Sequence, residues 1–330
     1  MTAPTTTPRR LVRRGVDEFL RFREASILLV TIALVVYFQT ATPVFLTEGN
    51  LVTISHYVAP VAIIAAGQVL LLVSGEIDLS VGHMYALAPF LMLYGMNSGL
   101  PVLPAIALAL AAGAAVGLVN GLVTVVLGVP SFVTTLGMLF LLSGITLVTS
   151  NAYPAPIPDG ARGVSGWLGG GPWAEIIWAI AIVVVFQIVL SRTRWGLHTV
   201  AVGGNAHGAS EAGVRVRNIK IGNFMITSLL GAFTGILEAF RITSIEPLAG
   251  GSGIMFAAVA AAVIGGTALA GGSGTIVGAF LGAVVLGVLR DGFNLIGISA
   301  NRFDLILGAA ILIAMVLNVY LARLRTRGAV

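Results

Sequence analysis

Long apolar runs separated by short polar breaks recur along the whole chain. A helix needs about 20 mainly apolar residues to cross the hydrocarbon core of a bilayer, so the runs predict about ten membrane spans. The pattern therefore indicates an all-α polytopic membrane protein. The predicted spans cover residues 25–44, 52–74, 81–97, 101–128, 131–149, 174–191, 221–243, 254–270, 274–296 and 303–322.

Two of these spans are less regular than the others. Residues 81–97 contain Pro89, and residues 254–270 are rich in glycine and alanine. Proline removes a helical hydrogen bond, and glycine lowers helix propensity. Each of these two spans therefore either crosses the membrane or forms a half-helix that ends inside it.

Basic residues flank the spans and predict their orientation. Most of the 18 lysines and arginines fall within residues 9–23, 192–220 and 323–327. Such clusters stay in the cytoplasm because Lys and Arg resist translocation. An even number of predicted spans separates each cluster from the next, so both termini are predicted to be cytoplasmic.

This topology divides the chain into three parts. A basic cytoplasmic segment, 1–24, precedes a single membrane domain, 25–322, and a cytoplasmic tail, 323–330, follows. Within the membrane domain, the loop 192–220 is cytoplasmic. The loops on the outer side are then 151–172, 245–252 and 297–302.

Composition excludes several classes of protein. Only 9% of the residues are charged, against about 25% in soluble domains. The pI near 10.1 comes from short segments beside the spans, whereas nucleic-acid binding needs a folded basic face. Without cysteine there is no disulfide or thiolate metal site. The only lysine, Lys220, precedes Ile221 rather than the Ser or Thr of a P-loop, and we expect no enzyme activity, cofactor or metal ion in this chain.

Glycine is abundant, with 42 residues, and its spacing predicts close helix packing. Small residues drive helix association in membranes because they let backbones approach. One stripe comprises Gly113, Gly117 and Gly121, and another comprises Gly278, Gly282 and Gly287. The runs 265–266 and 271–274 are expected to break helices, and either line a solute pathway or serve packing alone.

Residues 75–82 read Gly-Glu-Ile-Asp-Leu-Ser-Val-Gly and lie between two predicted spans. Carboxylates at such a place are costly unless the backbone breaks there and the groups face protein or water. This octet is therefore predicted to be a helix break. Asp78 or Ser80 is placed to accept hydrogen bonds from free amides at the start of the next helix. The break residues are Gly75, Glu76, Asp78, Ser80 and Gly82.

The cytoplasmic loop 192–220 is predicted to contain a short helix, 206–212, ended by Gly213 in a left-handed cap. A short helix tethered between two spans suits docking into a groove of another subunit. The alternative is a solvated basic loop that only obeys topology.

The octet closely resembles the Gly-Gly-Ile-Asp-Leu-Ser-Val-Gly signature of the ribose-type, simple-sugar permease subunits of bacterial ABC importers. Glu76 stands where that family usually has its second glycine. The stretches 193–196, 203–205 and 211–214 resemble the cytoplasmic loop of the same family, with His198 where Arg is usual. The run 258–269 resembles its C-terminal half, although Met255-Phe256 replaces the usual Glu-Leu. Branched-chain amino-acid permeases share the broader superfamily but are not expected to show this octet.

The resemblance implies a homodimeric permease with an architecture similar to the cobalamin-type (type II) importers, in the bacterial inner membrane. Its implied partners are an ABC ATPase subunit, which uses ATP and Mg, and an extracytoplasmic sugar-binding protein. The substrate is then a simple sugar or polyol whose identity depends mainly on the binding protein. The loop residues implied in coupling to the ATPase are Arg194, Gly196, Gly204, Asn205, Glu211 and Gly213.

A different class, an ion-coupled secondary transporter, stays open because intramembrane charges often mark ion relays. Glu238 and Arg241 share a helix face, and Arg290 adjoins Asp291. Each pair either carries protons or neutralises itself near the membrane boundary.

Further candidates are polar side chains within apolar spans and basic residues in outer loops. The candidate pathway residues can each instead hydrogen-bond a neighbouring helix; they are Gln68, Asn120, Ser131, Thr134 and Thr135. The basic residues predicted to dock the binding protein are Arg162 and Arg302.

Overall fold

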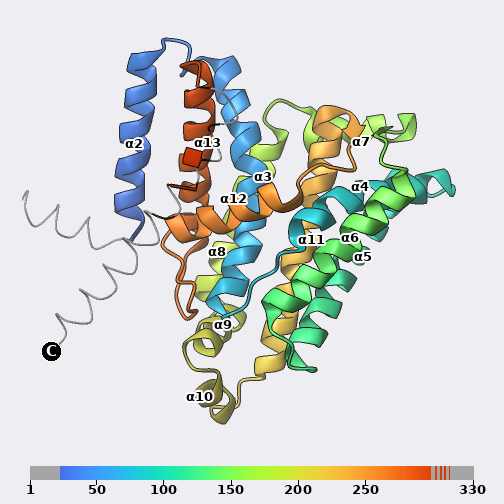
Figure 1. Ribbon diagram of the computed structural model, residues 1–330, viewed down its shortest axis with the longest axis vertical. Coiled ribbons are helices and arrows are strands. Elements are labelled where there is room, and N and C mark those ends of the chain that lie inside the picture. The colour runs from blue at the N-terminus through green and yellow to red at the C-terminus, as the bar shows by residue number, and fades with distance from the viewer. Residues whose placement is uncertain (1–22, 299–301, 303–304, 307, 310–311, 313–330) are drawn as a thin grey trace, which may run out of the picture.

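The computed structural model describes residues 23–298 and, beyond them, residues 302, 305, 306, 308, 309 and 312. These residues are mainly helical, as predicted (Figure 1). The long helices are α2 (Arg23–Ala41), α3 (Glu48–Val73), α4 (Val81–Asn97), α5 (Val102–Val125), α6 (Ser131–Ser150), α8 (Ala174–Arg192), α11 (Val216–Ile242), α12 (Gly251–Ile264) and α13 (Ile276–Leu295).

Two loops contain smaller elements. Between α8 and α11 lie α9 (Arg194–Gly204) and α10 (Ala206–Glu211). Between α6 and α8 lie strand β1 (Ala155–Pro156), a 3₁₀ turn η1 (Asp159–Ala161), helix α7 (Arg162–Ser165) and a π turn η2 (Gly166–Gly170). Strand β2 (Ser244–Ile245) follows α11.

Among the described residues, six helices are long and apolar enough to cross a membrane, namely α3, α5, α6, α8, α11 and α13. Helix α12 has 14 residues and α4 has 17, or about 21 and 25 Å at 1.5 Å per residue. Both are shorter than the roughly 30 Å hydrocarbon core, and α12 runs obliquely across the vertical helices (Figure 1). The polytopic helical class is confirmed, whereas the count of ten spans stays a prediction because 303–322 lies largely outside the described residues.

Helix α4 runs continuously through Pro89, so proline does not interrupt this segment. Proline at this position leaves the carbonyl four residues earlier, on Tyr85, without its helical donor. Gly235 of α11 lies directly against that carbonyl, and a side chain there would collide with it. Helix α11 therefore packs closely on α4 at the place where the proline frees a carbonyl.

Helices α3 and α11 form the centre of the molecule. Helix α3 packs against α8, α11, α12 and α13, and α11 also packs against α4 and α5. Within their most apolar windows, 83% of α3 is buried but only 17% of α6. The exposed apolar faces of the outer helices are those that lipid or other membrane subunits would cover.

The predicted glycine stripes lie at helix contacts. Gly117 of α5 faces α11, where an added Cβ would lie 2.6 Å from the Met225 Cα. On α13, Gly282 packs against Ala261 of α12, and Gly287 packs against Val58 of α3. The packing interpretation of both stripes is confirmed.

Long-range contacts group the loops at two ends of the molecule. At one end, β1 pairs antiparallel with β2, with Ala155 opposite Ile245. This pairing joins two loops that were predicted to share the outer side. At the other end, the Gly272 amide donates to the Val73 carbonyl at 2.8 Å, close to α9. The glycine run 271–274 thus breaks the chain between α12 and α13, as predicted.

Two boundaries around the cytoplasmic loop differ from the prediction. Helix α11 begins at Val216, so Lys220 belongs to a helix rather than to the loop. Helix α9 was not predicted, although its start follows from the side chain of Thr193, which accepts a hydrogen bond from the Gly196 amide at 3.4 Å. Threonine favours this capping position because its oxygen satisfies a free amide.

Candidate functional site

The octet forms the predicted break between α3 and α4. Helix α3 ends in a Schellman motif, in which the Gly75 amide donates to the Leu72 carbonyl and the Glu76 amide to the Leu71 carbonyl, at 3.0 and 2.9 Å. Gly75 has φ of +81°, a left-handed conformation that glycine adopts without steric cost. Gly82 sits in the first turn of α4, against the Gly251 backbone. Both glycines of the octet are therefore required by the backbone.

Asp78 is completely buried and organises the break. Its Oδ1 accepts from the amide and the hydroxyl of Ser80, at 2.8 and 2.6 Å. The predicted acceptor role is thus seen for Asp78, directly before α4. Of the two residues that the prediction offered, Asp78 is the acceptor: Ser80 is the N-cap residue but makes no capping bond with its side chain, and its hydroxyl donates to Asp78.

Three neighbouring helices brace the break with polar side chains that were predicted as pathway residues. Gln68 Nε2 of α3 donates to the Asp78 carbonyl at 2.5 Å. Asn120 Nδ2 of α5 donates to the Ser80 hydroxyl at 2.9 Å. The hydroxyl of Ser131, at the start of α6, accepts from the Ile77 amide at 3.4 Å. The structure brings these residues together as hydrogen-bond partners of the break.

The two remaining pathway candidates lie on α6. The Thr135 hydroxyl donates to the Ser131 carbonyl at 2.7 Å, one turn earlier in the helix. The buried hydroxyl of Thr134 has no partner in the described part of the chain. Contact of any of these polar groups with a solute stays a prediction.

Glu76 leaves the break and points to α11. Its Oε1 lies 2.6 Å from Lys220 Nζ, and the two side chains are only 13% and 19% exposed. A charge at this depth is stable chiefly when it is paired, because desolvation penalises a lone ion. The unusual glutamate of the octet is therefore compensated by the only lysine of the chain.

The α9–α10 segment lies beside the same end of α3. Trp195 Nε1 of α9 donates to Asn223 Oδ1 of α11 at 2.9 Å. Asn223 Nδ2 then donates to the Leu70 carbonyl of α3 at 3.2 Å. Asn223 is fully buried and so connects three helices. Sequence analysis missed it, although an asparagine near the start of an apolar span was a usable signal.

Within α9, the predicted coupling residues have different surroundings. Arg194 is exposed at the first position. Gly196 is buried against the Leu190 backbone, where no side chain fits. Gly204, at the end of α9, lies close to the backbone of Gly272. The glycine run between α12 and α13 therefore contacts this segment.

Helix α10 has the ends that the sequence predicted. Asn205 is its N-cap and accepts from the Gly208 amide at 3.0 Å. Gly213 ends it with φ of +84°, and the Val214 amide closes a Schellman motif on the Ala209 carbonyl at 2.9 Å. Glu211 lies exposed on this helix, 3.2 Å from His207. The helix projects at the lower end of the molecule (Figure 1).

A second charged cluster lies at the opposite end. Arg241 donates to Glu238 at 2.7 Å and lies 3.4 Å from the buried Glu175. Glu175 also lies 3.0 Å from His56 Nδ1 of α3. Glu238 and Arg241 thus pair with each other, as the interpretation of mutual neutralisation required. They do so within a larger network that was not predicted from the sequence. The sequence feature that indicates this network is a glutamate, Glu175, in the first turn of an apolar span.

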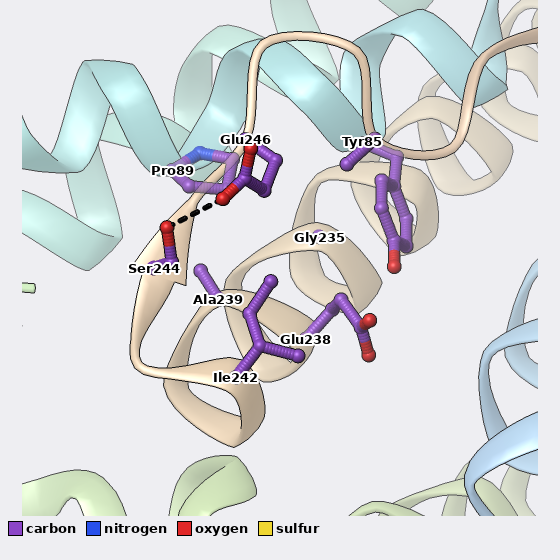
Figure 2. A pocket seen from close by; sticks show the side chains of 9 residues that line it. Tyr85, Pro89, Gly235, Glu238, Ala239, Ile242, Ser244 and Glu246 are labelled. Atoms are coloured by element: carbon purple, nitrogen blue, oxygen red, sulfur yellow. Dashed lines mark hydrogen bonds between the residues drawn. The ribbon is translucent and has the colours of Figure 1, made fainter. Parts of the chain in front are cut away.

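A small pocket adjoins this cluster. Figure 2 shows the side chains of Tyr85 and Glu238 on one side of the pocket and Pro89 next to Glu246 on the other, with Ser244 donating to Glu246. The cavity measures about 10 Å³, which is room for about one water molecule. A sugar does not fit in this conformation.

The other charged residues near the outer loops have varied surroundings. Arg162 is 79% exposed and pairs with Asp159 at 2.7 Å. Arg302 is exposed. Asp291 accepts from Asn50 at 2.7 Å, and the Arg290 guanidinium lies 4.6 Å from the centre of the Tyr57 ring. A role for Arg162 or Arg302 in docking stays a prediction.

Comparison with known proteins decides the family. The model of the permease component of branched-chain amino acid transport systems matches residues 50–315. A xylose/arabinose import permease of Sulfolobus acidocaldarius is 39% identical over 91% of this chain and 86% of its own length. The ribose import permease of Escherichia coli K12 is 35% identical over 96% of this chain and 99% of its own length. The chain belongs to the ribose-type import permeases.

Other relatives agree with this assignment. An L-arabinose ABC transporter permease of Azospirillum brasilense is 32% identical to this permease over 93% of the chain and 90% of its own length. No solved structure gives a significant match. Because the relatives match at nearly full length, this permease is a multi-pass membrane subunit of a transporter.

Proposed function

We propose that this permease is the membrane subunit of an ATP-driven importer and forms the pathway for a simple sugar, such as a pentose, hexose or polyol. The observation that carries the proposal is the full-length similarity to import permeases named for xylose, arabinose and ribose. The Azospirillum brasilense relative is named an ABC transporter permease, which favours the ATP-driven proposal over the ion-coupled alternative.

The proposed assembly is a homodimer of the permease with two ATPase subunits and one extracytoplasmic binding protein. It resembles the cobalamin-type importers and lies in the bacterial inner membrane with both termini cytoplasmic. The basic residues around α9 and α10 support this orientation. The permease itself does no covalent chemistry, since ATP and Mg are used by the ATPase.

Reconstitution tests this function. The permease would be purified with its ATPase, placed in liposomes, and supplied with binding protein and labelled ribose, xylose, arabinose and a polyol. We expect uptake of at least one of these solutes to require ATP and binding protein together. Uptake driven by a proton gradient in the absence of ATP would show that the proposal is wrong.

Within this assembly, α10 is proposed as the part that docks in the ATPase. Its capped ends hold it rigid, its face with Glu211 is exposed, and Asn223 links the neighbouring α9 to α3. Motion of the ATPase would then reach the membrane helices through a stiff segment.

Replacing Glu211 with Lys and Gly213 with Val together is expected to abolish ATPase assembly and sugar uptake while leaving membrane insertion intact. Valine at φ +84° is strained, at a cost of about 1–2 kcal/mol, and reversing the charge removes an exposed carboxylate of the docking face. Co-purification of the ATPase measures assembly. The control is Gly99→Val, which strains a left-handed glycine, φ +94°, in the turn between α4 and α5 and should preserve assembly. A double mutant with normal assembly and uptake would remove α10 from the coupling role.

Arg302 is proposed to dock the binding protein, with Arg162 as a second candidate. Reversing the charge with Arg302→Glu should weaken stimulation of ATP hydrolysis by the binding protein and spare the basal rate. Exposed charge pairs mainly steer association, so the defect should shrink as salt rises and screens the interaction. Arg162→Glu gives the comparison, because Arg162 already pairs with Asp159. If stimulation is unchanged at low ionic strength, Arg302 does not contact the partner.

A further inference from the structure

Three contacts lie at the end of the molecule that holds the helix break and the α9–α10 segment. One joins the break to α11, one joins α9 to α3 through α11, and one joins the glycine run 271–274 to the end of α3. The first is the ion pair between Glu76 and Lys220, 2.6 Å long. The second is the chain of hydrogen bonds through buried Asn223. The third is the bond from the Gly272 amide to the Val73 carbonyl. Only the first of these contacts reaches the octet itself.

The two charges occupy positions suited to transmit motion. Lys220 lies in the second turn of α11, whose first residue, Val216, follows the capped end of α10. Lys220 lies about 6 Å along the helix axis from Val216. Because a helix is stiff over one turn, a shift of α10 that moves the start of α11 also moves Lys220. Glu76 is two residues from Asp78, the buried carboxylate that organises the break.

The ion pair also lies in a partly buried place, where separating the two charges costs free energy. Both side chains are mostly enclosed, and removal of one partner leaves the other charge uncompensated in a poorly solvated place. The pair therefore holds the break and α11 together when either moves. A solvated surface pair would separate at little cost.

We propose that Glu76 and Lys220 are positioning residues that transmit the motion of the ATPase-docking segment to the helix break, so that ATP hydrolysis is coupled to opening of the sugar pathway. This inference rests on the proposed function, because it needs an ATPase bound at α10. It assigns to the pair a role in coupling, beyond its contribution to the stability of the fold.

The test is a charge-swap series in the reconstituted complex of permease, ATPase and binding protein. The variants are Glu76→Lys, Lys220→Glu and the double swap, and the readout is the number of ATP molecules hydrolysed per sugar imported. Each single reversal should raise this ratio by about tenfold, a usual size for coupling between sites. The double swap restores an ion pair and should bring the ratio back near the wild-type value.

Neutral variants serve if the charge reversals do not fold, and a charge reversal elsewhere on α3 serves as the control. If the single reversals do not fold, Glu76→Gln and Lys220→Gln replace them, with the same expected direction. Glu48→Lys is the matched control, because it reverses an exposed charge at the other end of α3 and should leave the ratio unchanged.

Two results would overturn the inference. A purely structural pair would lower ATP hydrolysis and uptake together and leave the ratio at the wild-type value. A double swap that stays as uncoupled as the single reversals would show that pairing is not what matters. Failure of the proposed function is recognised separately, because the wild-type complex would then show no ATP-dependent uptake at all, and the inference would be wrong with it.

Discussion

Replacing Asp78 with alanine is expected to destabilise the folded permease severely. The substitution leaves the amide and hydroxyl of Ser80 without their buried acceptor. Each buried donor left unpaired costs about 1–3 kcal/mol. It also loosens the contact with Asn120, which lies 3.4 Å from Asp78 Oδ2. The expected result is a lower melting temperature in detergent and a matching loss of uptake.

The control for this prediction is Asp78→Asn. Asparagine keeps a carbonyl oxygen that can occupy the place of Oδ1, so the loss of stability should be smaller than with alanine. Measurements of melting temperature and of uptake for several sugars separate two roles. If Asp78→Ala melts normally but changes the preferred sugar, Asp78 is a sugar ligand and the structural account given above is incorrect.

Replacing Gly117 with alanine is the second large effect that we expect. An added Cβ would lie 2.6 Å from the Met225 Cα and 2.7 Å from the Phe224 carbonyl carbon. These are backbone atoms of α11, so relief requires the helices α5 and α11 to move apart. Overpacking of this kind costs about 1–3 kcal/mol, which would appear as a lower melting temperature and reduced yield of the assembled complex.

The matched control is Gly144→Ala on α6. Gly144 is exposed, and its added Cβ meets nothing within 4 Å. Alanine has the higher helix propensity, by up to about 1 kcal/mol, so this variant should be neutral or slightly stabilising. Equal melting temperatures for Gly117→Ala and wild type would contradict the packing role of the stripe.

Features that depend on local chemistry were predictable. The apolar runs predicted the positions of most long helices to within five residues, because lipid requires each span to satisfy its own backbone. The exception is α12, which ends at Ile264, six residues before the predicted end of its span. Gly75 and Gly213 were predicted at helix ends, and both have positive φ. The stripe 113–121 was predicted to pack, and it does. Each of these conclusions needs only the chemistry of a segment and the solvent around it.

Other features depended on partners distant in sequence. Glu76 and Lys220 are 144 residues apart, and the bond from Asn223 to the Leu70 carbonyl joins residues 153 apart. The network of Glu175 with His56 and Arg241 is of the same kind. Sequence spacing along one helix shows which residues share a face, but it does not show which neighbour that face will meet.

The sequence by itself thus determined the membrane class, the helix break and the family resemblance, because hydropathy, glycine geometry and a short motif are local properties. Only the tertiary structure decided that Gln68, Asn120 and Ser131 brace the break. It also decided that Glu76 is paired and that α12 runs obliquely. The physical reason is that the rotation and crossing of packed helices follow from the sum of many weak contacts, and this sum selects the partner of each polar side chain.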